Sequence, residues 1–457
     1  MNLDSIQLPG CLNRRREAPA VQRICQAALN AVEPQQAVRE ALRFTGGTLR
    51  TLDGNYNLDD FDRVLLISIG KAALPMAKAM HGVLGGRITT GLVITKHAGD
   101  EVLANVEIIE AGHPLPDRRS QAAAERLISL LQTTTPRDLV ICLLSGGGSA
   151  LVTSPTACVS LDDLQQLTRA LLACGANITE INTLRRHLDR VKGGGLLRLG
   201  NPGAWLSLIL SDVLGSPLES IASGPAAADP TTFTDAAAIL DRYGLWDSIP
   251  QPVQSALCDG LAGKLLETVK PGDPCLQHVQ STIVGDNTVA AHAALQQAQM
   301  EGFHTLLLNE PLQGEASQVG AALGDMLRSA LLRDCPLPRP VCIVAGGEAT
   351  VTLRGGGKGG RNQELALGAA LQLAGVENAA LLTLATDGED STTGAAGAAA
   401  DGSTLQRARQ MGLTAEDTLR ENDSFTFFST LGDLLITGPT GTNVNDLVFL
   451  FAFEQTL

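Results

Sequence analysis

Apolar runs alternate with amphipathic stretches along most of the chain. The first clear run, residues 64–69, ends at Gly70-Lys71 and precedes a stretch with helical spacing. Further runs of strand length occupy 92–95, 106–110, 138–144 and 205–210, and helical patterns occupy 120–132, 161–174 and 181–191. We expect Ser120 to be the N-cap residue of its helix. Strands that alternate with helices are typical of βαβ units and favour a mainly parallel sheet.

The pattern restarts after a proline-rich interval over residues 247–280, where we place a connection between two domains. Later strands are predicted at 282–284, 305–308, 341–344, 381–385, 434–437 and 448–453, and helices at 289–299, 316–332 and 362–373. The sequence therefore predicts an α/β fold with two α/β domains, residues 1–270 and 271–457. Both sheets are expected to be largely parallel, with a cleft between the domains.

Composition narrows the possible partners. The chain has 34 Lys and Arg against 48 Asp and Glu, a net charge of −14, and only 3% aromatic residues. This balance argues against binding to nucleic acid or to an anionic membrane surface. We find no membrane-length apolar run and no signal-peptide core, and the nine cysteines contain no C-x-x-C pair. We expect a cytoplasmic protein, and a homodimer as the commonest assembly.

A glycine-rich loop follows the strand predicted over residues 138–144. In Ser145-Gly146-Gly147-Gly148-Ser149 the glycines allow backbone N–H groups to approach an anion such as a phosphate or carboxylate. The loop is neither a Walker A motif nor a nucleophile elbow. A tight strand-to-helix turn without a ligand is the alternative.

Cations lie at two other strand or helix ends. Gly70-Lys71 lies where ligands bind in open α/β sheets, and a lysine there can neutralise phosphoryl charge; a solvated lysine is the alternative. In the segment 185–195, helical spacing places Arg185, Leu188 and Lys192 near one face, so that this segment could hold an anionic substrate. On spacing alone, cations that favour a helix C-terminus explain the segment better.

The segment 355–361 contains a formal G-x-G-x-x-G motif. Because Lys358 and Arg361 place cations in it, we interpret Gly357, Lys358 and Gly359 as a backbone and cation cradle for phosphate rather than as a dinucleotide fingerprint. The alternative for Arg361 is a surface pair with Glu364.

Acidic residues end several predicted strands, namely Asp212, Glu348, Asp387, Glu389 and Asp390. Such carboxylates can hold Mg²⁺ or accept a hydroxyl proton, although a single one more often caps a turn. Asn445 lies in a polar loop, 438–446, that can contact substrate hydroxyls or simply form a turn. The seven histidines show no metal-ligand spacing, and we expect a structural role for each, including His113 in the loop 112–117.

Together these segments resemble the type II glycerate kinase family, the glycerate 2-kinases that end in a MOFRL domain. The resemblance runs from about residue 21 to the C-terminus. It rests on strings in family order at 69–72, 111–114, 144–151, 185–195, 210–215, 221–225, 345–348, 357–364, 385–388 and 437–446.

The resemblance implies a Rossmann-like N-terminal domain, a MOFRL-type C-terminal domain, and ATP-dependent phosphorylation of D-glycerate to 2-phosphoglycerate with Mg²⁺. The family's active-site lysine and arginine correspond to Lys71 and Arg361, and its strand-end aspartates to Asp212 and Asp387. Asp387 and Glu348 are the candidate metal ligands. The residues expected to bind nucleotide or substrate are Gly70, Ser145, Gly146, Gly147, Gly148, Ser149, Lys192, Gly357, Lys358, Gly359 and Asn445. Which glycine-rich loop binds ATP stays open.

Some positions depart from the family pattern. Ser391 and Gly394 stand where glycine and aspartate are usual, Asp189 where serine is common, and Ala226 where threonine is common. Two alternatives remain at this point. The segment 355–360 is the support for a nicotinamide-dependent hydroxypyruvate reductase, a name that family members also carry. The changes at Ser391 and Gly394 are the support for a non-catalytic small-acid sensor.

Overall fold

The computed structural model describes residues 6–332 and 338–454 and divides into two compact units. The first unit is Pro34–Val284, and the second is Gly285–Leu457 together with Met1–Glu33. These limits differ from the predicted domains 1–270 and 271–457, because the N-terminal helix α2 (Ala18–Ala31) packs on α12 (Asn287–Met300). Next to this contact, Arg23 pairs with Glu301 through two hydrogen bonds of 2.6 Å.

The first unit contains a six-stranded sheet in the order β6-β5-β4-β7-β8-β9. The strands are β4 (Arg63–Ile69), β5 (Thr90–Thr95), β6 (Val106–Glu110), β7 (Asp138–Ser145), β8 (Ala204–Leu210) and β9 (Val279–Gly285). The pairs from β6 through β8 are all parallel, which confirms the predicted Rossmann-like arrangement. Parallel pairing brings the carboxyl ends of β4, β7 and β8 to one edge of the sheet.

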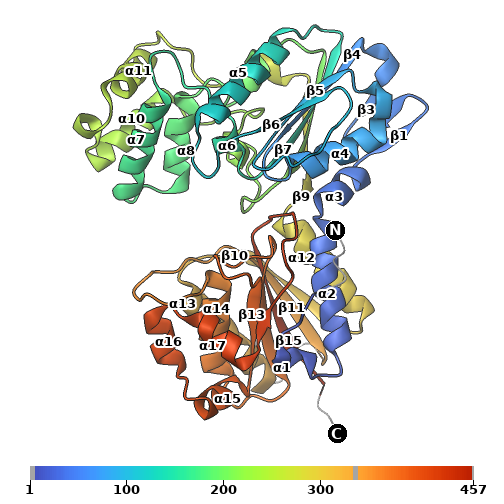
Figure 1. Ribbon diagram of the computed structural model, residues 1–457, viewed down its shortest axis with the longest axis vertical. Helices are drawn as coiled ribbons and strands as arrows, with labels where there is room; N and C mark the ends of the chain where they lie inside the picture. Colours follow the sequence, from blue (N-terminus) through green and yellow to red (C-terminus); the bar gives the residue numbers. More distant parts are fainter. Residues whose placement is uncertain (1–5, 333–337, 455–457) are drawn as a thin grey trace. The chain divides into compact units, whose positions relative to one another are not determined.

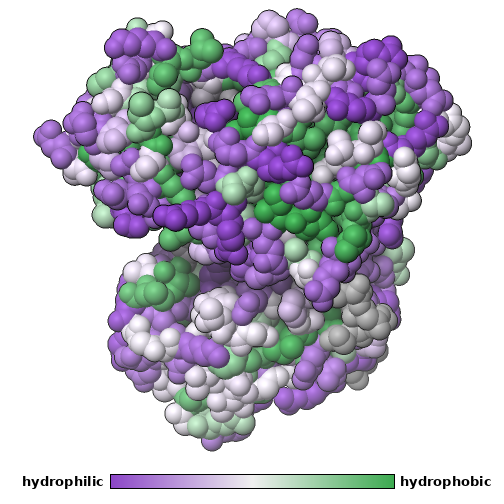
Figure 2. Space-filling model, turned by 45° about the horizontal axis from the view of Figure 1, so that its top comes forward, coloured by the Kyte–Doolittle hydropathy of each residue, from purple (hydrophilic) through white to green (hydrophobic). Residues whose placement is uncertain are grey.

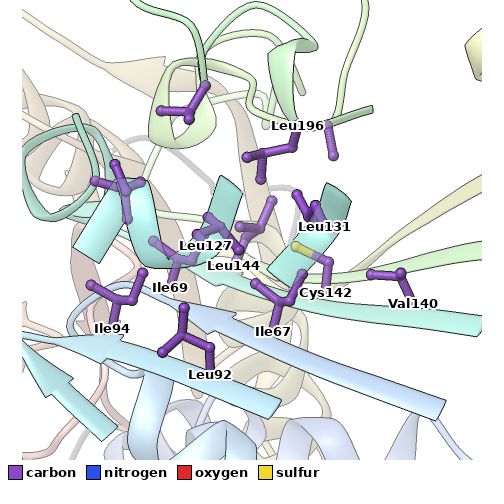
Figure 3. Close-up of a cluster of buried hydrophobic side chains, with 14 of the residues drawn as sticks. Ile67, Ile69, Leu92, Ile94, Leu127, Leu131, Val140, Cys142, Leu144 and Leu196 are labelled. Atoms are coloured by element: carbon purple, nitrogen blue, oxygen red, sulfur yellow. The ribbon is translucent and has the colours of Figure 1, made fainter. Parts of the chain in front are cut away.

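The core of this unit explains why the strand sequences are continuous apolar runs. Figure 3 shows Ile67 and Ile69 of β4 on the same face as Leu144 of β7, directed toward Leu127 and Leu131 of α5 (Arg118–Gln132). The next residue along β4, Ser68, faces the other way and donates a hydrogen bond to the Ala73 carbonyl at the start of α4 (Ala73–Leu84). Both faces are therefore covered by helices, as parallel sheets require.

Capping boxes determine where several helices begin. They occur at α5, α7 (Leu161–Ala173), α8 (Ile178–His187) and α10 (Phe233–Tyr243). Asp117, not Ser120, is the N-cap residue of α5, and Ser120 completes the box from the third helical position. Helix α8 ends earlier than the predicted 191, because its C-cap Leu188 leaves helical geometry.

The proline-rich interval contains a helix rather than only a connection. Pro252 lies in the first turn of α11 (Gln251–Leu261), where proline is tolerated. Figure 1 shows α7, α8, α10 and α11 gathered in one helical group, and their apolar side chains form a core of their own.

The second unit contains a mixed sheet in the order β10-β11-β15-β12-β13-β14. Its strands are β10 (His304–Leu312), β11 (Val341–Gly347), β12 (Ala379–Ala385), β13 (Gly397–Asp401), β14 (Leu434–Leu435) and β15 (Asp446–Ala452). Among the described strands of this sheet, β10 and β11 alone pair in parallel, so the prediction of a largely parallel sheet is wrong here. The C-terminal strand β15 runs antiparallel between β11 and β12, and a fully buried strand has the same apolar pattern in either direction.

Helices cover both faces of this sheet. In Figure 1, α2 and α12 lie on one face, and α13 (Ala316–Leu332) and α14 (Arg361–Leu373) lie on the other. A Cβ added to Gly320 would lie 1.9 Å from the Leu365 carbonyl oxygen, so the backbones of α13 and α14 touch. The remaining α-helices and strands are short: α1 (Gly10–Asn13), α3 (Pro34–Glu40), β1 (Arg43–Thr45), β2 (Thr48–Arg50), β3 (Asn55–Asn57), α6 (Gly148–Leu151), α9 (Gly195–Arg198), α15 (Thr404–Gln410), α16 (Ala415–Glu421) and α17 (Ser424–Leu431).

The surface agrees with the composition. The face shown in Figure 2 has many hydrophilic residues, with apolar residues gathered in patches between them. Within residues 6–332 and 338–454, no helix combines the length and the apolar character that crossing a bilayer requires. The cysteines of these ranges are free thiols, and Cys335 lies outside them.

Candidate active site

The carboxyl edge of the first sheet brings together the predicted residues of this unit. Gly70 and Lys71 follow β4, Ser145 ends β7, and Asp212 comes just after β8. The Lys71 backbone N–H donates to the Gly146 carbonyl at 2.9 Å, and the Ala72 N–H donates to Ser145 Oγ at 3.1 Å. The two loops are therefore held against each other by hydrogen bonds.

Two glycines make this close approach possible. Gly70 has φ of +133°, and a Cβ there would lie 2.1 Å from Ser145 Oγ. A Cβ on Gly146 would lie 2.0 Å from Asp212 Oδ2. The glycines thus allow loops from three neighbouring strands to meet, and they place the Asp212 carboxylate directly beside the Gly146 backbone.

Replacing Gly70 with alanine is expected to lower the free energy of unfolding by about 1–3 kcal/mol, because the new methyl group overlaps Ser145 in an already packed loop. Gly82→Ala is the matched control, since Gly82 lies inside α4 with no atom within 4 Å of its added Cβ. That change should stabilise the protein by about 0.5–1 kcal/mol. Equal effects of the two substitutions in urea denaturation would contradict the predicted steric role of Gly70.

Gly147 brings Lys71 and His113 to the same place. It has φ of +85°, and a Cβ there would lie 3.1 Å from both Lys71 Cγ and His113 Nε2. Burial, together with the charges of Lys71 and Lys96, lowers the pKa of His113 to about 4. The imidazole is half-buried, and no hydrogen bond to it is found within the described part of the chain.

The depressed pKa of His113 predicts a pH dependence of stability. Between about 4 and the ordinary value of 6.5, the unfolded chain binds a proton at this histidine that the folded chain does not. The neutral histidine therefore contributes fully to the free energy of unfolding above pH 6.5. This contribution is lost as the pH falls toward 4. Urea denaturation at several pH values should show that acidification lowers the free energy of unfolding less in His113→Asn than in the wild type. The same pH dependence in both proteins would refute the lowered pKa of His113.

A pocket of about 200 Å³ opens beside Gly147. One wall is apolar and comes from α7 and α8, with Leu164, Leu167, Leu171, Ile181 and Leu184. The rest of the lining is largely polar and includes His113, Ser149, Arg185 and Lys192. The pocket therefore combines the predicted anion loop with the cationic segment 185–195.

Lys192 is buried in the wall of this pocket. Its ammonium donates to Asp189 Oδ2 at 2.6 Å, to the Val152 carbonyl at 2.9 Å and to Thr153 Oγ1 at 3.3 Å. Burial lowers the pKa of Lys192, and the carboxylate of Asp189 opposes this effect. An ammonium has three N–H donors, so all of them have protein acceptors. Asp189, which stands where the family commonly has serine, is the counter-ion of Lys192.

Ser149 lies next to a segment with an unusual backbone. Its Oγ is 2.7 Å from Ser223 Oγ. Ala222 and Ser223 have φ of +52° and +62°, and a Cβ on Gly148 would lie 2.7 Å from Ala222 Cβ. Such left-handed positions cost of order 1–3 kcal/mol each and gather at functional sites.

The second unit gathers its own predicted residues at one end of its sheet. Gly347 of β11 and Ala385 of β12 both pair with Asp446, the first residue of β15. Glu348 follows Gly347 directly, and Asn445 directly precedes Asp446. Asp387 lies two residues after Ala385. Of the strand-end carboxylates predicted to converge, Glu348, Asp387, Glu389 and Asp390 thus follow β11 and β12 at one edge of this sheet, whereas Asp212 follows β8 in the sheet of the first unit.

Arg361, the first residue of α14, binds two of the acidic residues at this edge. Its guanidinium donates to both oxygens of Asp446, at 2.5 and 3.2 Å, and to Glu348 Oε1 at 2.5 Å. Burial raises the pKa of Asp446 to about 6 against the opposing charge of Arg361. Asp446 was not among the predicted site residues. The alternative pair of Arg361 with Glu364 does not form, because Glu364 is buried and accepts from Asn422 Nδ2 at 2.8 Å.

Asp390 and Asn445 support the site through the backbone. Asp390 is buried and accepts the N–H groups of Gln363 at 2.9 Å and Asn362 at 3.2 Å, at the N-terminus of α14. The Asn445 carbonyl accepts from the N–H and the hydroxyl of Thr386, at 3.2 and 2.6 Å, and so fixes the turn that leads to Asp387.

The two predicted magnesium ligands, Asp387 and Glu348, differ in how far their carboxylates are already occupied. Glu348 is already bound to Arg361, whereas the exposed carboxylate of Asp387 accepts one hydrogen bond, from the Glu389 N–H at 3.1 Å. Within residues 6–332 and 338–454, no group of three or more His, Cys, Asp or Glu forms a metal site. Mg²⁺ commonly uses one or two carboxylates together with substrate phosphates, so a single available carboxylate fits this ion.

The segment around Lys358 packs against residues 421–425. The Gly357 N–H donates to the Glu421 carbonyl at 2.8 Å, and the Lys358 N–H donates to Asp423 Oδ1 at 3.0 Å. Lys358 Nζ lies 4.2 Å from the centre of the Phe425 ring, and a Cβ on Gly359 would lie 2.2 Å from Ser424 Oγ. Packing against the protein accounts for these two glycines without a ligand.

Comparison with known proteins connects both halves of the chain to one family. Residues 20–258 match a family described as a domain of unknown function, DUF4147, and residues 341–446 match the MOFRL family. A glycerate 2-kinase of Pyrococcus horikoshii is 39% identical over 427 residues, 93% of this chain and 95% of the relative. A putative hydroxypyruvate reductase of Agrobacterium vitis is 40% identical over 84% of this chain and 86% of the relative. The crystal structure of a glycerate kinase from Thermotoga maritima matches with a TM-score of 0.83 and 39% identity, over 94% of this chain and 98% of that one. The chain therefore belongs to the type II glycerate kinase family, the glycerate 2-kinases that end in a MOFRL domain.

Proposed function

We propose that this chain transfers the γ-phosphoryl group of ATP to the 2-hydroxyl of D-glycerate, with Mg²⁺, and forms 2-phosphoglycerate. The observation that carries this proposal is the cluster of Lys71, the Gly146 loop and Asp212 at the carboxyl edge of a parallel sheet. A cation, a glycine-rich loop and a carboxylate at one point are the parts that phosphoryl transfer to a hydroxyl requires.

In the first unit, each group has a distinct role. The 2-hydroxyl oxygen forms the new bond to the γ-phosphorus while the bond to the β–γ bridging oxygen breaks and ADP leaves. Lys71 stabilises the negative charge on the phosphoryl oxygens during this transfer. Asp212 accepts the hydroxyl proton, with Asp387 as the alternative base.

In the second unit, Arg361 provides a further cation for the phosphoryl charge. Asp446 and Glu348 hold its guanidinium in a fixed orientation, so little reorganisation is needed during the reaction. Asp387 would hold Mg²⁺, which when bound supplies positive charge against the phosphate oxygens of ATP.

The test is the release of ADP from MgATP by the purified full chain with D-glycerate, with a glycerate-free control. We expect glycerate-dependent ADP release and a product whose phosphate is bonded to the C2 oxygen by NMR. Oxidation of NADH with hydroxypyruvate in the absence of ATP, without any kinase activity, would favour the reductase instead. Thermal stabilisation by D-glycerate without turnover would favour a sensor.

The contacts of the glycine-rich segment 355–360 favour the kinase over a reductase with a nicotinamide cofactor. The formal G-x-G-x-x-G motif of this segment was the support for the reductase, and Gly355, Gly357 and Gly359 all contact the segment 421–424 of the protein itself. We also propose a cytoplasmic location, which the free thiols in the described part of the chain support.

A further inference from the structure

We propose that Arg185 binds the carboxylate of the acceptor acid in the pocket beside Gly147, an assignment that rests on the proposed kinase function. Arg185 lies in the last turn of α8 and lines the pocket. Its guanidinium makes one long hydrogen bond, 3.4 Å to Asn182 Oδ1, and forms no ion pair with a residue of the described ranges. Burial lowers the pKa of this arginine, since removal from water disfavours its charge.

The neighbouring cations Arg186 and Lys192, unlike Arg185, have carboxylate partners within the protein. Arg186 pairs with the buried carboxylate of Asp229 at 3.0 Å, and it also donates to the Glu219 carbonyl at 3.1 Å. Lys192 has protein acceptors for all three of its N–H donors, as described above. Arg185 is therefore the cation of this pocket with donors to spare, whereas Lys192 and residues 146–149 were among the residues predicted to bind nucleotide or substrate.

A guanidinium has five N–H donors, and a half-buried one without a counter-ion is costly unless an anion enters. A carboxylate matches its geometry because two parallel hydrogen bonds form at once. One unpaired cation also balances the single charge of a small acid better than the several charges of a triphosphate. Arg185 and Gly147 both line the pocket of about 200 Å³, and a Cβ on Gly147 would lie 3.1 Å from Lys71 Cγ. An acid held by Arg185 could therefore direct its hydroxyl toward the Gly147 loop and Lys71.

The kinetic test compares D-glycerate with its neutral amide, glyceramide, as acceptors. In Arg185→Gln, KM for D-glycerate should rise on the order of 10- to 100-fold while KM for ATP stays unchanged. The wild-type preference for glycerate over glyceramide should also collapse, and Arg185→Lys should recover only part of it. Arg126→Gln is the matched control, because it removes an exposed arginine charge from α5, outside the pocket. A rise in KM for ATP, or an equal loss with both acceptors, would overturn the assignment.

A second readout needs no catalysis. Because Arg185 is desolvated and unpaired, Arg185→Met should raise the melting temperature of the ligand-free protein by about 2–4 °C and abolish the shift caused by D-glycerate. A merely structural arginine would give a lower melting temperature and retain the shift, which would refute the proposal. Wild-type protein that is stabilised by D-glycerate through Arg185 but releases no ADP would support this site and refute the proposed kinase function.

Discussion

Replacement of Lys71 with alanine is expected to lower kcat by about 10³-fold or more and to leave the melting temperature nearly unchanged. The large kinetic effect follows from the role of this ammonium in stabilising the transferred phosphoryl group. The small effect on stability follows from its position, because the side chain is exposed and the contact to Gly146 is made by the backbone N–H, which alanine retains. Steady-state kinetics and thermal denaturation of the same preparation measure both quantities.

Lys78→Ala is the matched control for the loss of a charge. Lys78 lies further along α4, where it pairs with Glu101 at 2.6 Å. We expect its kinetics to match the wild type. Near-wild-type turnover of a folded Lys71→Ala protein would remove Lys71 from the mechanism, whereas a comparable loss in both variants would show only a general effect of net charge.

The second large effect is expected for Arg361→Ala, which should reduce both activity and stability. The loss of a cation that acts in the transition state is expected to lower kcat by about 10³-fold. In addition, Asp446 is 6% exposed and would lose its guanidinium partner. Leaving such a group unpaired costs about 1–3 kcal/mol, which urea denaturation would detect.

A double-mutant cycle separates these two consequences of removing Arg361. In Arg361→Ala/Asp446→Asn the buried carboxylate is gone, so we expect most of the lost stability to return and the activity to stay low. Asp446→Asn alone should weaken the orientation of Arg361 and lower kcat less than Arg361→Ala does. Recovery of activity in the double variant would show that Arg361 acts only as a structural partner of Asp446.

The positions of several strands and helices could be read from the apolar pattern because local sequence carries that information. The run 106–110 is a strand with those limits, and α13 spans the predicted 316–332. Strand direction could not be read in the same way. The run 448–453 was expected in a largely parallel sheet, but it lies antiparallel between strands that are distant in sequence.

The residues of the candidate site could be predicted where one short segment contains the functional side chains. Lys71, Asp212 and the loop 145–149 each follow a strand, and parallel pairing brings them together. The partners of cations depend on long-range contacts, which the sequence does not reveal. Arg361 meets Asp446 across 85 residues, and Lys192 meets the Val152 carbonyl across 40.

Ser391 shows how the structure gives a physical reason for a family pattern. Its φ is +63°, in the left-handed region that favours glycine, and glycine is usual at this position in the family. Gly394 has φ of +74°, and an added Cβ there would meet no atom within 4 Å. Both positions in the turn after Asp387 therefore have left-handed backbone conformations.

The helical group α7, α8, α10 and α11 supplies the apolar wall of the pocket and has its own core. The loops that hold Lys71 and Asp212 belong instead to the sheet, which has a separate core. The apolar wall of the pocket and the reactive groups are thus encoded in different parts of the chain. Evolution or design could therefore change which acid is accepted by exchanging residues on α7, while the machinery of phosphoryl transfer is inherited unaltered.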